Sequence, residues 1–313
     1  MTVPKIHATN LDANESAFFA RQLEFIKARS YDVLYPEFSA TRLLPVSTDA
    51  GAGAESITYR QFDSVGLMKL IASYADDLPR SDVFGKEFTS PIRSFGGSYG
   101  YNVQEIRSAQ MAGIPLTQRK ANAARQAWEQ LVNRFAYFAD GSAAFGGLFG
   151  LFYAPNKTVC AAPTGGWGSA TADQIIADIN YAINRSRVLS KGVEISDTVI
   201  MGLTQFTKIA STPRSTNSDT TILEFVRKTN PGVTFEGINE CEAVTPKPSG
   251  ASTATNILVA YRRSTDKLEL AMPQPYEQFP PQERNLEYIV PTHGRLGGLI
   301  LYYPLSVTVM EGL

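Results

Sequence analysis

The clearest candidate for chemistry is a glycine-rich motif, Gly96-Gly-Ser98-Tyr-Gly100, which matches the G-x-S-x-G pattern of serine hydrolases. That pattern needs a sharp turn from a strand into a helix, so that the serine is presented to a base. His293 follows downstream, and Asp266 could complete a triad in the right chain order. The context is poor, because an arm and a hairpin precede the motif instead of several strands of a parallel sheet. We therefore interpret the glycines as a turn between two strands, with a serine hydrolase using Ser98 and His293 as the alternative from another functional class.

Other residues that could support catalysis or bind a metal are few. Two cysteines, Cys160 and Cys241, and two histidines are too few for a disulfide framework or an ordinary zinc site, so we expect two free thiols in a reducing compartment. The adjacent carboxylates Asp76 and Asp77 could bind a metal ion or act as an acid–base couple, but only Asp82 accompanies them at useful spacing. We interpret the pair as an exposed loop tip or an intersubunit ion-pair site. Neither a cofactor nor enzymatic activity is expected.

The composition is that of a folded protein without a charge bias. Of the 313 residues, 43% are hydrophobic and 19% are charged, which excludes disorder as the main state because disorder needs low hydrophobicity and high net charge. Lys and Arg number 29 against 30 Asp and Glu, so the chain lacks the basic excess of a dedicated nucleic-acid binder. The N-terminal residues lack the charged-then-apolar order of a signal peptide, and no run reaches the ~18 apolar residues of a membrane span.

The elements that must position these residues begin with a segment that cannot close a core of its own. A short helix is predicted from about Ser16 to Arg29, and the stretch 30–46 follows with two prolines and no helical period, which favours extended backbone. Strand-like alternation appears in 57–62. A second run, 67–74, is predicted to form a long hairpin or loop with it, and 86–95 is a further strand candidate.

The strongest helix prediction covers 117–139, where apolar residues recur at spacings of three and four. A helix of that length is about 34 Å long, and Asp140-Gly141 supplies its stop. Trp128 is expected on the buried stripe of this helix, among core residues at helical spacing. The helix is long enough to span a domain.

The second half of the chain mixes helices and strands without a strict strand–helix–strand rhythm. Thr171 and Gln174 form a capping box that starts a helix with an isoleucine face, and Thr221 with Glu224 starts another. Strands are predicted over 198–201, 233–236, 257–261, 268–272 and 298–303, with a short helix over 204–210. The mixture favours an α+β fold over a doubly wound sheet.

The order of these parts resembles the tailed-bacteriophage major capsid proteins, which share the Hong Kong ninety-seven fold with encapsulins. The resemblance covers most of the chain, from about Tyr31 to the end. It is carried by Tyr74-Ala-Asp-Asp-Leu-Pro-Arg-Ser-Asp-Val, Gly100-Tyr-Asn-Val-Gln-Glu-Ile-Arg-Ser-Ala, Lys120-Ala-Asn-Ala-Ala-Arg with Asn133-Arg-Phe-Ala, Gly147-Leu-Phe-Gly-Leu-Phe and Arg295-Leu-Gly-Gly-Leu-Ile-Leu-Tyr-Tyr-Pro.

The resemblance implies how the chain is divided. The implied parts are an N-terminal arm over 1–50, an extended loop (E-loop) over 51–85, a peripheral domain over 86–165 with a long spine helix over 117–139, an axial domain over 166–290, and return strands of the peripheral domain over 291–313.

The resemblance also implies a function without catalysis. The protein is expected to assemble in the host bacterial cytoplasm into hexamers and pentamers of an icosahedral phage head, and to remain in the virion as its structural shell. Expected partners are further copies of itself, a portal, a separate scaffold protein and packaged double-stranded DNA contacted non-specifically; no membrane partner is expected. Many members begin with a long scaffold segment that is removed, and this chain has no room for one, so it is expected to be mature as written or to depend on the separate scaffold protein. The alternative within the fold is an encapsulin-like nanocompartment shell.

The expected extended loop holds the candidate contact residues. A projecting loop cannot bury its apolar side chains within its own subunit, and a neighbouring copy could pair its charges. Lys69 lies on the loop where some relatives form a lysine–asparagine crosslink, but nothing in the sequence identifies a partner, so no crosslink is predicted. The candidates for intersubunit contact are Arg60, Phe62, Lys69, Asp76, Asp77 and Arg80.

Overall fold

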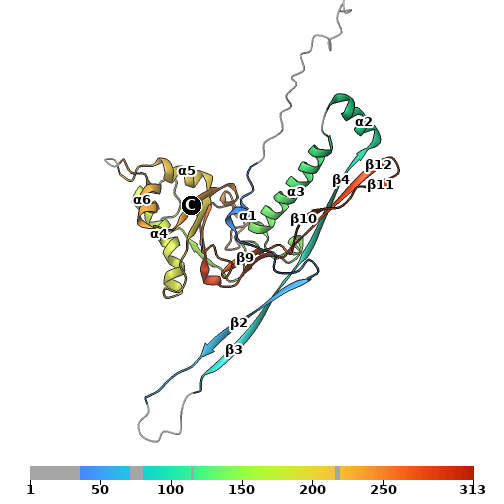
Figure 1. The fold of residues 1–313 in the computed structure, drawn as a ribbon. Coiled ribbons are helices and arrows are strands. Elements are labelled where there is room, and N and C mark those ends of the chain that lie inside the picture. The colour runs from blue at the N-terminus through green and yellow to red at the C-terminus, as the bar shows by residue number, and fades with distance from the viewer. Residues whose placement is uncertain (1–35, 71–79, 114–115, 216–218) are drawn as a thin grey trace, which may run out of the picture. The chain divides into compact units, whose positions relative to one another are not determined.

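The computed structural model describes residues 36–70, 80–113, 116–215 and 219–313. The chain divides into two compact units, Met1–Glu37 and Phe38–Leu313, and all elements below belong to the second. The helix predicted over 16–29 lies outside the described residues. The helices are α1 (Ala40–Leu43), α2 (Val103–Ala112), α3 (Leu116–Phe138), α4 (Ala172–Leu189), α5 (Leu203–Ser211) and α6 (Ile222–Thr229), with 3₁₀ turns η2 (Ala143–Phe145), η3 (Asn239–Cys241) and η4 (Pro304–Ser306) (Figure 1).

The largest sheet has five strands and is buried on both faces. Its order is β5 (Thr158–Ala161), β14 (Val307–Glu311), β8 (Ile257–Tyr261), β6 (Thr198–Gly202) and β7 (Thr234–Ile238). The outer pairs β5–β14 and β6–β7 are parallel, and the inner pairs are antiparallel. Because successive side chains of a strand point to opposite faces, this sheet separates two hydrophobic cores. Along β8, Ile257 and Val259 enter one core, and Leu258 and Ala260 enter the other.

The helices α4, α5 and α6 cover one face of this sheet (Figure 1). The capping box at Thr171 and Gln174 is formed as predicted, and Ile175, Ile179 and Ile183 are buried in the core beneath α4. A second capping box, Thr221 with Glu224, starts α6. The helix face and both caps were therefore correctly read from spacing alone, because each depends only on residues within one or two turns.

The core on the other face includes residues of α1 and α3, and three smaller sheets lie elsewhere in the chain. One sheet is β1 (Val46–Ser47), β9 (Leu268–Ala271) and β13 (Gly298–Leu301). A second holds β10 (Gln274–Gln278), β12 (Glu287–Leu296) and β11 (Gln282–Arg284), and β12 also pairs with β4 (Arg93–Asn102) over the full length of both strands. The third is the hairpin of β2 (Ser56–Val65) and β3 (Asp82–Pro91).

The long helix α3 lies against β4 and is buried mainly in its C-terminal third (Figure 1). Val132, Phe135 and Ala136 enter the core, and the Phe135 ring meets Phe95 of β4 edge-on at 4.9 Å. The helix starts at Leu116, one residue before the predicted start, and Gly141 adopts the left-handed conformation (φ +79°) expected of its stop. Trp128 is half-buried, and its ring occupies the space that a side chain at position 294 would need, so only glycine fits there.

Several predictions of the N-terminal half were wrong. The stretch 30–46 was predicted to lack helix, yet Ala40–Leu43 form α1, and Leu43 and Leu44 are buried in the core. The strand 57–62 pairs with β3, whereas residues 67–70 of the second run are in no strand and 71–74 lie outside the described residues. The predicted strand 86–95 spans the junction of β3 and β4, and Gly96-Gly97 lie inside β4 opposite His293 and Thr292 instead of forming a turn.

The sequence also missed elements that alternation or turn residues do not reveal. These are α2, which starts at an Asn102–Glu105 capping box, and the strands β1, β5, β10, β11, β12 and β14. The division into domains remains a prediction. Two strands of the five-stranded sheet, β5 at 158–161 and β14 at 307–311, fall outside the range 166–290 proposed for the axial domain. β14 joins the sheet by pairing with β8, and β5 pairs with β14 at the edge.

The buried tyrosines make stability depend on alkaline pH. The Tyr137 hydroxyl shares a 3.0 Å hydrogen bond with Ser39, and the Tyr261 hydroxyl donates to the Leu43 carbonyl at 2.9 Å. Burial raises the pKa of both phenols well above the ordinary value of 10.0. Because the pKa of these two phenols is raised in the folded state, the contribution of the two tyrosines to stability is complete below about pH 10. It falls as the pH rises further, because the phenols then lose their protons in the unfolded chain but keep them in the folded one.

We therefore expect the urea midpoint of unfolding to fall between about pH 9 and about pH 11. Tyr261→Phe should weaken this pH dependence, because one of the two buried phenols is then removed. An unfolding midpoint that stays constant over this range, or a Tyr261→Phe protein with an unchanged pH dependence, would contradict the assignment.

Candidate intersubunit surface

The β2–β3 hairpin is fixed to the subunit at its root. There the Tyr59 ring stacks on Phe88 at 5.2 Å and meets Tyr302 edge-on at 4.9 Å. The Ser90 hydroxyl donates to the Gly297 carbonyl at 3.2 Å, and the Ile92 amide donates to the Glu55 carbonyl at 2.9 Å. Burial raises the pKa of Tyr59, which agrees with a ring enclosed on both sides.

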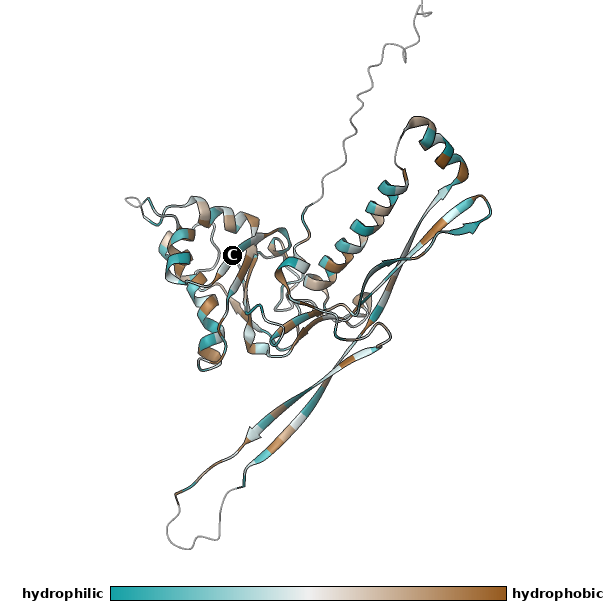
Figure 2. Ribbon diagram, in the orientation of Figure 1, coloured by the Kyte–Doolittle hydropathy of each residue, from teal (hydrophilic) through white to brown (hydrophobic). Residues whose placement is uncertain are grey.

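Beyond the root, the hairpin is exposed on both faces. Every described residue over 60–70 and 80–87 is exposed, although many of them are apolar. The side chains of Phe62 and Phe84 are 67% and 60% exposed, and they lie on opposite faces of the hairpin because Phe62 is opposite Gly85 and Phe84 is opposite Asp63. The apolar set is Phe62, Val65, Leu67, Met68, Leu70, Val83 and Phe84, and brown segments mark the hairpin in Figure 2.

The structure gives the environment of four of the six candidate contact residues. Arg60 forms an ion pair with Glu87 directly across the hairpin at 2.7 Å, so its first partner is in its own chain. The Phe62 ring lies over Gly85, where an added Cβ would be 2.9 Å from Phe62 Cε1. Lys69 and Arg80 are exposed. Asp76 and Asp77 lie outside the described residues, so the charged end of the hairpin stays a prediction.

The Ser98 and His293 pair does not have the geometry of a nucleophile and its base. Ser98 lies in the middle of β4 opposite Pro291, and His293 is opposite Gly96, two positions further along the ladder. The strand is continuous through Ser98, so the sharp turn that the hydrolase pattern requires is not formed. Among the hydrogen bonds of the described residues, none joins Ser98 to His293. Asp266 lies in the turn before β9, outside both strands.

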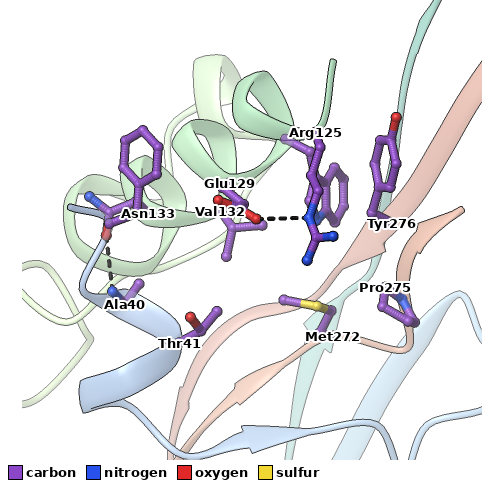
Figure 3. A pocket seen from close by; sticks show the side chains of 11 residues that line it. Ala40, Thr41, Arg125, Glu129, Val132, Asn133, Met272, Pro275 and Tyr276 are labelled. Atoms are coloured by element: carbon purple, nitrogen blue, oxygen red, sulfur yellow. Dashed lines mark hydrogen bonds and ion pairs between the residues drawn. The ribbon is translucent and has the colours of Figure 1, made fainter. Parts of the chain in front are cut away.

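An open cleft of about 400 Å³ separates α1 from α3 (Figure 3). Its walls include Trp128, Met272 and Tyr276. Arg125 and Glu129, which also line the cleft, form an exposed ion pair at 3.1 Å. Asn133 closes one end, because its side-chain oxygen accepts from the Ala40 amide at 3.0 Å and its amide donates to Glu240. The cleft offers no nucleophile beside a base, and we interpret it as a packing gap bridged by Asn133.

The two cysteines are free thiols, as expected from the sequence. Cys241 is fully buried, and burial raises the pKa of its thiol. Cys160 on β5 is half-buried, and burial raises the pKa of its thiol to about 11. Both thiols are therefore protonated and poorly reactive at neutral pH. In the described ranges, no group of three or more potential ligands is placed to hold a metal ion, and no helix is long and apolar enough to cross a membrane.

Comparison with known proteins places this geometry in a family. The family model for the major capsid protein matches residues 66–313. No curated protein matches the chain. The solved capsid of Myoviridae phage XM1 is 18% identical with a TM-score of 0.84, and the match covers 95% of this chain and 99% of that one.

Two further solved structures share the fold at lower similarity. A structure from Mycobacterium phage Ogopogo is 14% identical with a TM-score of 0.66, over 93% of this chain and 97% of that one. A virus-like particle from Pyrococcus furiosus is 12% identical with a TM-score of 0.50, over 86% of this chain and 90% of that one. The α+β phage-capsid fold that the sequence resemblance implied is thereby confirmed.

The hairpin root and its outer half should differ in their effect on subunit stability. We expect Tyr59→Ala to lower the free energy of unfolding by about 2 kcal/mol, because it removes two aromatic contacts at the root. Phe62→Ala should change it by less than about 0.5 kcal/mol, because that ring is largely in water. Urea unfolding of unassembled subunits measures both values. Equal losses would show that the outer half is part of the subunit core.

The Asn133 bridge gives a second prediction. Asn133→Ala leaves the Ala40 amide and the Glu240 carboxylate without their partner, so we expect a loss of about 2–3 kcal/mol in the free energy of unfolding. Asn122→Ala is the matched control, because Asn122 is exposed on the same helix, and it should change stability by less than about 0.5 kcal/mol. If the two variants are equally stable, the bridge does not hold α1 on α3.

Proposed function

Because the chain belongs to the major capsid protein family, we propose that copies of it assemble into hexamers and pentamers of a closed icosahedral phage head enclosing double-stranded DNA. The protein is then a structural component of the virion, assembled in the host bacterial cytoplasm. Its partners are other copies of itself, a portal and a separate scaffold protein, and the packaged DNA is contacted non-specifically. The near-zero net charge is compatible with this role, since a closed shell confines DNA without having to bind it tightly.

The observation that carries the proposal is the exposed apolar hairpin. A monomeric protein rarely keeps several large apolar side chains in water on both faces of one hairpin, and such surfaces usually mark protein contacts. Here Phe62 and Phe84 are exposed on opposite faces, and the hairpin contributes little to the core of its own subunit. A hairpin laid across an adjacent subunit would bury both faces. Arg60, Phe62, Lys69 and Arg80, together with Asp76 and Asp77, are the proposed contact residues.

We propose no catalytic step for this protein. Ser98 is on a continuous strand, and Arg125 and Glu129 are an exposed pair in an open cleft. The alternative within the fold is an encapsulin-like shell that holds cargo instead of DNA. The phage structures favour a phage head, because the capsid of phage XM1 has a TM-score of 0.84 against 0.50 for the virus-like particle from Pyrococcus furiosus.

The test is to shorten the hairpin without disturbing its root. Residues 62–85 are replaced by Asn-Gly, which joins the directly opposed pair Gln61 and Lys86 through a two-residue turn. We expect the subunit to keep its unfolding midpoint, because the described residues among those removed, 62–70 and 80–85, are exposed. We expect no shells in electron microscopy, because each lost contact is repeated at every symmetry-related interface.

Arg60→Gln is the milder companion variant. This variant removes one side of the Arg60–Glu87 ion pair. Where an adjacent subunit excludes water from the pair, each contact between subunits should weaken by about 2–5 kcal/mol. An exposed pair within one subunit is worth at most about 1 kcal/mol. Intact shells from the shortened protein would refute the proposed role of the hairpin. An unfolded shortened subunit would show that the hairpin belongs to the core.

A further inference from the structure

The segment after α4 has its polar and apolar sides reversed. Residues 193–196 alternate in the manner of a strand, but the polar side chains point inward and the apolar ones outward. Glu194 and Ser196 are 3% and 2% exposed, whereas Val193 and Ile195 are 69% and 53% exposed. In a soluble subunit standing alone, the hydrophobic effect favours the opposite arrangement.

Specific contacts hold this reversed arrangement in place. The Glu194 carboxylate forms an ion pair with the Lys267 ammonium at 2.6 Å, and the Glu194 backbone amide donates a hydrogen bond to the Ser190 hydroxyl at 2.8 Å. The second Glu194 carboxylate oxygen and the Ser196 hydroxyl are buried without a hydrogen-bond partner. Burying an incompletely paired carboxylate costs free energy, and so does leaving Val193 and Ile195 in water.

The exposed residues of this segment are part of a larger apolar area. The end of α4 adds Val188 and Leu189, and η4, which contacts α4, adds Leu305 with the adjoining Tyr303. Lys267 links the two segments, because its ammonium pairs with Glu194 and lies 4.1 Å from the centre of the Tyr303 ring. Brown colouring marks the end of α4 in Figure 2. We call the set Val188, Leu189, Val193, Ile195, Tyr303 and Leu305 the α4-end patch.

One residue of the hairpin root is next to the α4-end patch in the chain. Tyr302, the neighbour of Tyr303, meets the Tyr59 ring of β2 edge-on at 4.9 Å and donates a hydrogen bond to Glu269 at 2.6 Å. In a ring of identical subunits, each copy also needs two unlike surfaces, one for each neighbour.

We propose that the α4-end patch is a contact surface for a second copy of this chain, and that the reversed burial at 193–196 exists because the outward apolar side is covered in the assembly. This inference rests on the proposed shell function. The ion pair between Glu194 and Lys267 acts as the positioning element: it holds the carboxylate inward, so that Val193 and Ile195 face the neighbour. The patch is separate from the hairpin residues that the sequence indicated.

Thiol labelling tests the proposal directly. Ile195→Cys and Val188→Cys are made separately and reacted with a maleimide, once as assembled shells and once as dissociated subunits. The native thiols give little background, because Cys241 is buried and Cys160 is half-buried with a pKa of about 11. The unmodified protein treated in the same way is the control. We expect the introduced thiols to react at least tenfold more slowly in shells than in free subunits.

A double substitution tests the same surface by assembly. Val193→Ser with Ile195→Ser should leave circular dichroism unchanged, since both side chains are exposed, and lower the yield of shells at least tenfold. Met111→Ser on α2 is the matched control, because Met111 is equally apolar and 95% exposed outside the patch, and it should leave the yield unchanged.

The outcomes separate this inference from the proposed function. If the unmodified protein forms no particles, the proposed function fails and the inference with it. If it forms shells but the introduced thiols react equally fast in shells and subunits, the inference alone is overturned. An unfolded double variant, or an equal loss of shells with Met111→Ser, also overturns it, since the patch would then be subunit core or would have no specific role.

Discussion

The five-stranded sheet depends on one constraint: each of its central strands must fill two hydrophobic cores at once. Along β8, Ile257 and Val259 enter one core while Leu258 and Ala260 enter the other, and β14 divides Val309 and Met310 in the same way. A shift of either strand by one residue would exchange these side chains between two cores of different shape. This double burial fixes the register of the sheet, and with it the positions of α1 and α4, which pack on its two faces.

Because stability is concentrated around this sheet, other segments are free to carry apolar side chains that their own subunit does not bury. The hairpin is fixed at Tyr59 and Ser90 but exposes Phe62 and Phe84. The segment after α4 is fixed by the Glu194–Lys267 ion pair but exposes Val193 and Ile195. A subunit built in this way can fold before it meets a neighbour, and the exposed apolar surface supplies a driving force that acts only on association.

The polar contacts have a different task, which is to fix orientation. Asn133 bridges the Ala40 amide and Glu240, so that α1 is held on α3 across an open cleft. Tyr261 donates to the Leu43 carbonyl and ties the same short helix to the central strand β8. Each of these bonds contributes modestly to the net stability, but leaving either buried group unpaired would cost more. They therefore select one arrangement among several that the apolar contacts alone would allow.

The sequence by itself determined the features that depend on near neighbours in the chain. It predicted α3 to within one residue at each end, the capping boxes of α4 and α6, and the five central strand segments from Thr198 to Leu301, because periodicity and caps are local. The order of its motifs also identified the family. It did not predict that Leu43 and Leu44 enter the main core, that β2 pairs with β3, or that Gly96 and Gly97 lie inside a strand opposite β12.

Those outcomes were decided by the tertiary structure, since each depends on a partner far away in the chain. Of the candidate contact residues, Arg60 and Phe62 could be selected because charged and aromatic residues on a projecting loop suggest contact, but the pairing of Arg60 with Glu87 follows from the hairpin register alone. Val193 and Ile195 were not selected, because a strand-like alternation has the same pattern whichever side faces the core. In the tertiary structure Glu194 pairs with Lys267 on the inner side, and Val193 and Ile195 face outward.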